Sequence, residues 1–203
     1  GIADDTLIVC SSDNGAPSYI GFDDLNAPYR GWKANFFEGG IHVPMLVEWP
    51  ARIAPGTVID DPVAHVDLFA TAAAAAGGEM PTDRVMDGLD MMAMIDSPDT
   101  VPERALFWRS DHYRVLLEGG WKLQVSEYPD RSWLFNLNED PTEQVDLAAA
   151  EPARLAQMRA RLDALNAEQS APLWPSLVSA PIYVDTHALE ERDADDTYVL
   201  WSN

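Results

Sequence analysis

Asp13 and Asn14 are the residues whose types and position most directly suggest a ligand site. They follow an apolar, β-branched run at residues 6–10. That run predicts a strand buried on both faces of a parallel sheet, and α/β folds bind ligands at the carboxyl ends of such strands. A carboxylate next to an amide oxygen suits a hard cation such as Ca²⁺ or Mg²⁺. The alternative is a simple turn, because Asp, Asn and Gly15 all tolerate turn dihedrals.

Lys33 is a second candidate, since it lies in a loop rich in glycine and aromatic residues. Neighbours such as Trp32 and Phe36 are expected to desolvate its ammonium group in part. An ammonium group held near a cation would attract a tetrahedral anion. These two positive charges would locally reverse the negative field of an acidic chain. The alternative is a lysine whose stem covers the aromatic rings while its head stays in water.

The elements around these candidates follow from the pattern on either side. Residues 16–40 mix Gly, Pro, Asn and aromatics without a period, which predicts a long irregular loop, and such loops are usually functional. Residues 41–49 predict a second strand, whose first half is weakened by Pro44.

The composition limits the class of protein. The 203 residues include 13 basic and 34 acidic side chains, a net charge of −21, and 47% are hydrophobic. This excludes disorder as a class and argues against nucleic acid as a partner and against polybasic membrane binding. No apolar run approaches the roughly 20 residues that span a bilayer. One cysteine, Cys10, excludes an internal disulfide but leaves the compartment open, and we expect it to be a buried strand thiol.

A change of period marks the second half of the chain. Asp67 is expected to cap a helix through alanines 72–76, with Gly77-Gly78 as its end, and residues 79–104 predict a connector. Beyond it, alternation predicts four short strands, with Gly119-Gly120 in a hairpin, and a helix follows at 152–168. The predicted strands are residues 105–109, 113–117, 121–125 and 133–137.

The order of the motifs resembles the sulfatase family of the alkaline phosphatase superfamily, over roughly residues 3–166. Near the N-terminus the motifs are Ser12-Asp13-Asn14-Gly15, Gly31-x-Lys33, Glu38-Gly39-Gly40-Ile41-x-Val43-Pro44 and Trp49-Pro50. Further along they are His65-Val66-Asp67-Leu68-Phe69, Gly120-Trp121-Lys122-Leu123, Leu134-Phe135-Asn136-Leu137, Asp140-Pro141, Glu143 and Asp146-Leu147-Ala148.

This resemblance implies an α/β fold: the C-terminal part of an alkaline-phosphatase-like mixed sheet with helices, plus a small α+β subdomain of a four-stranded antiparallel sheet and one helix. The expected division is 1–104 for the α/β core, 105–170 for the subdomain and 171–203 for an acidic, aromatic tail.

The resemblance also implies roles. Asp13 and Asn14 would be ligands of a divalent cation, usually calcium and alternatively magnesium, and Lys33 would contact the sulfate group. The substrate would be a sulfate ester, either a small molecule or a sulfated glycan. A metal and an ammonium group are suited to the negative charge that sulfate transfer develops.

The chain departs from the family pattern in two ways. The family's formylglycine nucleophile arises in a Cys/Ser-x-Pro-x-Arg motif, and none of the five Pro-x-Arg triplets here has Cys or Ser two residues before it. No catalytic residue is therefore assigned, and we expect a C-terminal portion that is inactive alone. His42 stands where many relatives carry arginine. His65 is expected to be structural, while His112 beside Asp111 and His187 near Asp185 could form surface pairs and receive no role.

Three functions stay open: the C-terminal portion of a sulfatase, part of a phosphate or phosphonate ester hydrolase of the same superfamily, and a non-catalytic binding domain. A sheet cut through its middle would leave an exposed edge. We therefore also expect this chain to self-associate into a homo-oligomer through that edge.

Overall fold

The computed structural model describes residues 1–97, 100–174 and 176–202. The chain forms two compact units, Gly1–Ser11 with Met45–Glu103 and Ser12–Pro44 with Arg104–Asn203. Asp13, Asn14 and Lys33 all belong to the second unit. The expected division at residues 104 and 170 stays a prediction about the family's domains. Among the described residues, no helix is both long and apolar enough to cross a membrane.

In the first unit, after a short 3-10 turn at Ala3–Asp5, β1 (Ile8–Ser11) pairs antiparallel with β2 (Met45–Glu48). The prediction of a parallel strand buried on both faces is wrong here, because β2 is the ladder partner of β1 within the described residues. Cys10 is consequently exposed and not a buried thiol. Ile8 and Leu46 are also exposed, and self-association through this edge stays a prediction.

The second predicted strand begins later than expected. Residues up to Ile41 form the helical turn α1 (Glu38–Ile41), and Pro44 has no N–H to give to a ladder, so β2 starts at Met45. The doubt that the sequence placed on the first half of residues 41–49 is confirmed.

The alanine helix is α2 (Asp67–Ala75), and its predicted end is confirmed. Gly77 has a φ of 69°, its N–H bonds to Ala74 O, and the Gly78 N–H bonds to Ala73 O, which is a Schellman motif. Asp67 is the first helical residue and not the cap before it. Its buried carboxylate accepts the backbone N–H groups of Ala64 and Leu89, so it fastens the start of the helix to a later segment.

The expected connector at 79–104 contains a helix, α3 (Met91–Asp96). Asp90 caps it by accepting the Met92 N–H at 2.9 Å. Met91 and Met94 are buried, and α3 contacts α2. Two methionines of the expected connector are therefore part of the packing of the first unit.

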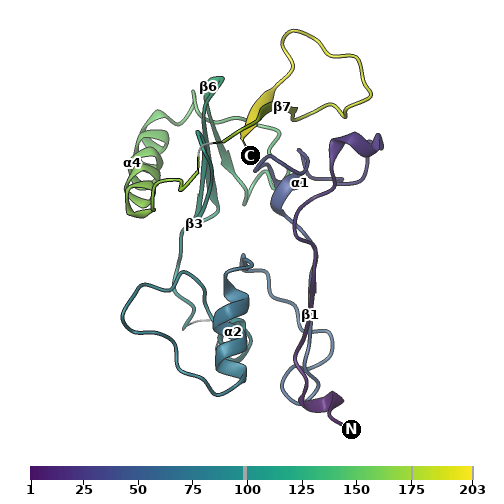
Figure 1. The fold of residues 1–203 in the computed structure, drawn as a ribbon, viewed down its shortest axis with the longest axis vertical. Coiled ribbons are helices and arrows are strands. Elements are labelled where there is room, and N and C mark those ends of the chain that lie inside the picture. The colour runs from purple at the N-terminus through teal and green to yellow at the C-terminus, as the bar shows by residue number, and fades with distance from the viewer. Residues whose placement is uncertain (98–99, 175, 203) are drawn as a thin grey trace. The chain divides into compact units, whose positions relative to one another are not determined.

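The second unit contains the four predicted strands and the predicted helix (Figure 1). The strands are antiparallel and neighbour one another in sequence order. Gly119 and Gly120 have φ values of 58° and 77°, as a two-residue hairpin loop of the primed type requires. The elements are β3 (Leu106–Ser110), β4 (Tyr113–Glu118), β5 (Trp121–Glu127), β6 (Asp130–Asn136) and α4 (Pro152–Glu168).

One face of this sheet packs against α4. Side chains alternate between the faces of a strand, and Leu116, Leu123 and Leu134 point to the same side. They form a cluster with Met158 and Leu162 of α4. The amphipathic period read for residues 152–168 is confirmed by this contact.

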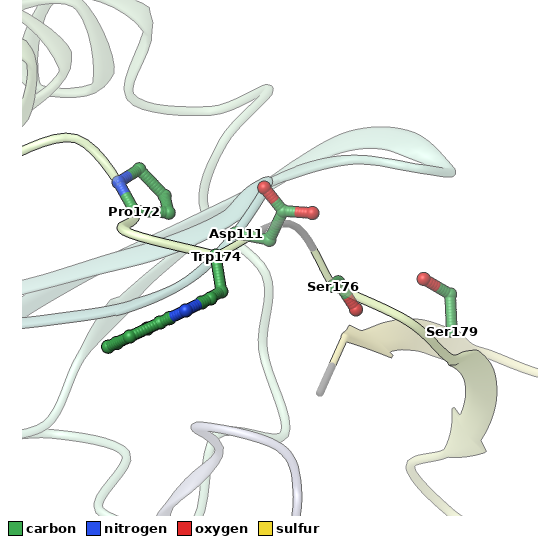
Figure 2. Close-up of a pocket in the computed structure, with 5 residues that line it drawn as sticks. All are labelled: Asp111, Pro172, Trp174, Ser176 and Ser179. Carbon is green, nitrogen blue, oxygen red and sulfur yellow. The ribbon is translucent and has the colours of Figure 1, made fainter.

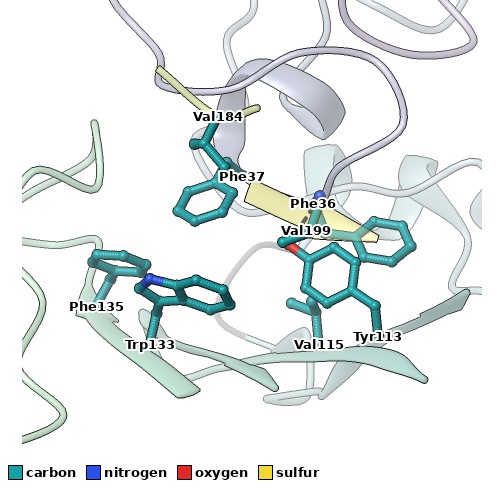
Figure 3. Packing of buried hydrophobic residues seen from close by; sticks show 8 residues of the cluster. All are labelled: Phe36, Phe37, Tyr113, Val115, Trp133, Phe135, Val184 and Val199. Carbon is teal, nitrogen blue, oxygen red and sulfur yellow. Dashed lines mark hydrogen bonds between the residues drawn. The ribbon is translucent and has the colours of Figure 1, made fainter. Parts of the chain in front are cut away.

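The opposite face is covered by the N-terminal part of the unit and by the tail. Phe36 and Phe37 lie over Tyr113 and Trp133 of the sheet (Figure 3). Val199 joins the same cluster from a C-terminal hairpin, β7 (Ser179–Tyr183) and β8 (Tyr198–Ser202). The tail therefore docks on the sheet.

Candidate functional site

Asp13, Asn14 and Lys33 lie on one segment, residues 12–42, which we call the site segment. Two backbone hydrogen bonds bring its ends together: the Gly15 N–H donates to Gly40 O at 2.9 Å, and the Lys33 N–H donates to Ala16 O at 3.0 Å. Asp13 and Asn14 thus belong to the same backbone framework as Lys33. Apart from α1 and a 3-10 turn at Ser18–Ile20, the segment is irregular, as expected.

A single side chain braces this framework. Asn26 accepts the Ala16 N–H at 2.7 Å and donates its amide hydrogens to Ala16 O and Gly31 O, both at 3.0 Å. The Gly39 N–H adds a bond to Arg30 O at 2.7 Å. The order of an otherwise irregular loop therefore comes from backbone groups that are paired inside it.

Close approach explains the glycines of the segment. A Cβ on Gly15 would lie 1.8 Å from Gly39 O, and one on Gly40 would lie 2.2 Å from Asn35 O. These are backbone contacts that a side chain could not displace. The framework therefore requires glycine at both positions.

The candidate ligands are accessible. Asp13 and Lys33 are exposed and Asn14 is half-buried, while the Ser12 hydroxyl fixes the turn by donating to Asn14 O at 2.8 Å. The expected desolvation of Lys33 is wrong, because Trp32 and its aromatic neighbours turn into the protein and leave the lysine at the surface. One carboxylate and one amide oxygen, both reachable, fit part of the coordination shell of a hard cation.

Asp23, His187 and Glu190 form another group that could hold a metal ion. The Leu189 N–H donates to Nδ1 of His187 at 3.1 Å, so a neutral His187 carries its proton on Nε2. That proton faces the Asp23 carboxylate at 3.0 Å. The arrangement is therefore an ion-pair contact between loop and tail, and Asp23 lies against the nitrogen that a metal would need.

A buried ion cluster lies beneath the site segment. Lys122 of β5 bonds through Nζ to Glu38 Oε1 at 2.7 Å and to Glu143 Oε1 at 3.0 Å. Lys122 and Glu143 are fully buried and Glu38 is 7% exposed. Glu143 also accepts the backbone N–H of Glu38 at 2.5 Å. The start of α1 is thereby fixed to the sheet by its side chain and to the turn after β6 by its backbone.

A chain of neutral groups extends this cluster. Gln124, next on the same face of β5, donates to Glu143 Oε1 at 2.9 Å and accepts the hydroxyl of Tyr113. The Tyr113 oxygen in turn accepts the Phe36 N–H at 3.2 Å. Buried polar groups of this kind are costly unless satisfied, and here each finds a partner in the site segment or the sheet.

The charges of the cluster perturb its titration. Burial by itself would raise the pKa of Glu38, but Lys122 and then His42 lower that pKa to about 2. Burial would lower the pKa of Lys122, yet Glu143 and Glu38 raise it above its usual value. Burial raises the pKa of Glu143, and Lys122 opposes that rise. Lys122 therefore stays charged at neutral pH and serves as the common cation of both carboxylates.

His42 and Arg30 connect the cluster to its surroundings. His42 bonds through Nδ1 to Glu38 Oε2 at 2.8 Å, and its ring stacks on Tyr29 with centroids 4.2 Å apart. Arg30 forms two hydrogen bonds with Asp185 of the tail, at 2.5 and 2.7 Å. The tail and the site segment are therefore joined by the Arg30–Asp185 ion pair.

Glu38, Lys122 and Glu143 lie within the motifs of the family resemblance, but the residue pattern predicts no role for them. The local signal was weak, because Lys122 and Gln124 alternate with apolar residues as on any strand with one wet face. A charged residue between Phe37 and two glycines, as Glu38 is, is a better sign of burial.

Comparison with known proteins gives the class of this fold. A family model described as Sulfatase matches residues 1–78. The steryl-sulfatase of Rattus norvegicus is 46% identical over 149 residues, covering 70% of this chain and 25% of that protein. The N-acetylgalactosamine-6-sulfatase of Mus musculus is 30% identical over 135 residues, covering 66% of this chain and 26% of that protein.

The solved structures agree with this class. The crystal structure of Ps i-CgsB matches this chain with a TM-score of 0.71 and 29% sequence identity. The match covers 85% of this chain and 39% of the Ps i-CgsB chain. Mixed α/β architecture with antiparallel sheets and few helices is common to both. The chain belongs to the sulfatase family, whose members hydrolyse sulfate esters, and it spans about a quarter of the length of the curated relatives described above.

The ion cluster predicts an inverted pH dependence when its cation is removed. In the native chain the lowered pKa of Glu38 contributes stability that is complete above its ordinary value of 4.5 and is lost as the pH falls through about 2. In Lys122→Met two carboxylates stay buried without their common cation, so we expect the free energy of unfolding to drop by about 3–5 kcal/mol at pH 7. It should recover as the pH falls from 7 to 5, because protonation relieves the repulsion.

Urea unfolding followed by tryptophan fluorescence at several pH values measures this. Lys33→Met is the matched control, because the chain has two lysines and Lys33 is the exposed one; it should stay within about 0.5 kcal/mol of the native chain. A Lys122→Met chain whose stability follows pH in parallel with the native chain would contradict the role of the cluster.

Proposed function

We propose that the site segment supplies part of the cation and sulfate site of a sulfate-ester hydrolase. Asp13 and Asn14 would provide oxygen ligands to a divalent cation, Ca²⁺ in the first instance and Mg²⁺ as the alternative, and Lys33 would bind the sulfate group. The observation that carries the proposal is the pair of backbone bonds Gly15–Gly40 and Lys33–Ala16, which hold the candidate ligands on one framework.

The chemistry of the three side chains supports this. A bound cation would offset the negative charge that develops on the sulfate oxygens and the leaving group. Asp13 and Asn14 keep oxygens free for it at the surface, and the exposed ammonium group of Lys33 can donate to a sulfate oxygen. A framework that is ordered before the ligand arrives lowers the cost of arranging these groups.

The substrate class extends the proposal. The relatives are named for a steryl sulfate and for a sulfated N-acetylgalactosamine, which supports a sulfate ester of a small molecule or glycan as the substrate of the whole protein. Within this chain no Cys/Ser-x-Pro-x-Arg motif occurs, so we propose that residues 1–203 do not turn over a sulfate ester by themselves.

Calcium titration tests the cation ligands. With two protein ligands we expect weak binding, with a Kd of about 1 mM, and at least a tenfold loss in Asp13→Asn because a carboxylate is replaced by a neutral amide. Calorimetry in physiological salt measures it, since salt screens general attraction to the acidic surface. Asp130→Asn, another exposed aspartate of the same unit, is the control. An equal loss of calcium affinity in both variants would show that the binding comes from general surface charge, and would contradict the site.

Nuclear magnetic resonance of labelled lysine side chains tests the sulfate contact. The chain has one exposed lysine, Lys33, and one fully buried lysine, Lys122, so each signal is assigned by one substitution. In the presence of Ca²⁺, sodium sulfate should shift the Lys33 signal with saturation and leave the Lys122 signal in place. A Lys33 signal that does not move contradicts the contact, and a larger response to phosphate would favour the phosphate-ester alternative.

A further inference from the structure

A second group of polar side chains in mutual contact lies outside the site segment, at the C-terminal hairpin. Asp111 Oδ2 lies 3.0 Å from Nδ1 of His112, and Nε2 of His112 lies 3.0 Å from the Ser202 hydroxyl. That hydroxyl is also 3.0 Å from the Ser179 hydroxyl. The imidazole and the two hydroxyls therefore form a hydrogen-bonded chain, and the carboxylate lies within ion-pair distance of the other nitrogen of the imidazole.

Local structure explains why these residues meet. Ser179 and Ser202 face each other in the β7–β8 ladder, so their side chains share one face of the hairpin. The Ser110 hydroxyl donates to Ser202 O at 3.2 Å and ties β8 to the end of β3. Asp111, with a φ of 51°, turns the chain sharply there and places the aspartate next to His112.

The chemistry of the groups fixes the direction of the chain. An ionised Asp111 accepts only, so a neutral His112 carries its proton on Nδ1 and accepts at Nε2. The Ser202 hydroxyl then donates to Nε2 and accepts from Ser179. The exposed end of the chain is the Ser179 oxygen, whose proton points inward and whose lone pairs stay outside.

The same end of the chain opens into a pocket. Ser179 is exposed whereas Ser202 is 9% exposed. A pocket of about 470 Å³ is lined by Asp111, Pro172, Trp174, Ser176 and Ser179 (Figure 2). Trp174, which is 78% exposed, supplies an aromatic ring to the lining. A hydroxyl, a carboxylate and an aromatic face around one pocket suit a small ester with an apolar group.

We propose that this chain is a proton relay that makes Ser179 a nucleophile toward carboxylic ester substrates in this pocket. The Ser179 oxygen bonds to the acyl carbon while its proton passes to Ser202, and the Ser202 proton passes to His112. The C–O bond to the alcohol then breaks, and the proton returns from His112 through Ser202 to the leaving oxygen. Water releases the acyl group by the same route, so the serine is regenerated.

The roles within the relay differ. Ser179 alone touches the substrate and is the catalytic residue. His112 and Ser202 act through it, and Asp111 holds the imidazole in the required tautomer. The titratable groups that pack against His112 in the described structure come from its own turn, Asp111, and from the turn after β5, where the Tyr128 ring lies edge-on at 5.1 Å. The relay uses none of the residues of the proposed sulfate site.

A fluorophosphonate probe tests the relay on the intact chain. The Ser179 oxygen would bond to phosphorus as fluoride leaves, with the proton taken up through Ser202 by His112. Mass spectrometry should place the adduct on Ser179, and the pH dependence of labelling should be lost in His112→Asn. His112→Asn should slow labelling by about 10²-fold, the scale of a general base.

Variants separate the relay from a structural fastening of β8. Ser179→Ala should abolish the adduct, and Ser170→Ala, at an exposed serine outside the residues that line the pocket, should leave the rate unchanged. Hydrolysis of p-nitrophenyl acetate should follow the same pattern. No adduct in the native chain, an adduct on Ser202 or spread over many serines, or labelling independent of pH would overturn the proposal even if His112→Asn fails to fold.

Discussion

The buried position of Lys122 between Glu38 and Glu143 is the constraint on which the second unit depends. Removing a charge from water costs several kcal/mol, so each member of the cluster is tolerable only while the other two are in place. Lys122 comes from β5, Glu143 from the turn after β6 and Glu38 from the site segment. The segment therefore cannot leave the sheet without exposing the partners of a buried cation.

This arrangement gives an irregular loop the order of a regular element. Loops are normally mobile because their backbone groups are bound to water. In the site segment, Phe36 and Glu38 donate backbone N–H groups to side chains of the unit, and the glycines permit a contact closer than any side chain allows. The loop itself places Phe36 and Phe37 on the face of the sheet that receives it, so apolar burial and the ion cluster support the same placement. Order of this kind is what a site for a small anion and a cation requires.

Much of the fold of the second unit could be predicted from the sequence. Alternation gave the four strands to within three residues at each end, period gave α4 at its observed bounds, and Gly119-Gly120 gave the hairpin. The burial of Lys122 and Gln124 could not be predicted, because alternation does not say whether the polar face meets water or a loop. The prediction of a buried parallel strand at residues 6–10 was wrong for the opposite reason. An apolar run indicates a tendency to be buried, but the strand with which it pairs decides where it lies.

The candidate site could likewise be predicted only in part. Asp13, Asn14 and Lys33 were chosen from residue types and a family resemblance, and their metal and sulfate roles stay predictions. Their common framework depends on Asn26, Gly15 and Gly40, contacts that no local pattern encodes. The docking of the tail through Val199 was equally hidden, because an acidic composition masks the alternation of a short hairpin.

Hydrogen exchange of individual amides in Lys122→Met tests the central claim most directly. The amides of Gly15, Lys33 and Glu38 should be protected in the native chain and should lose protection together in the variant, under conditions in which the amides of α4 remain protected. Unchanged protection of Gly15 and Lys33 would show that the site segment holds its framework without the buried cation, and would contradict the account.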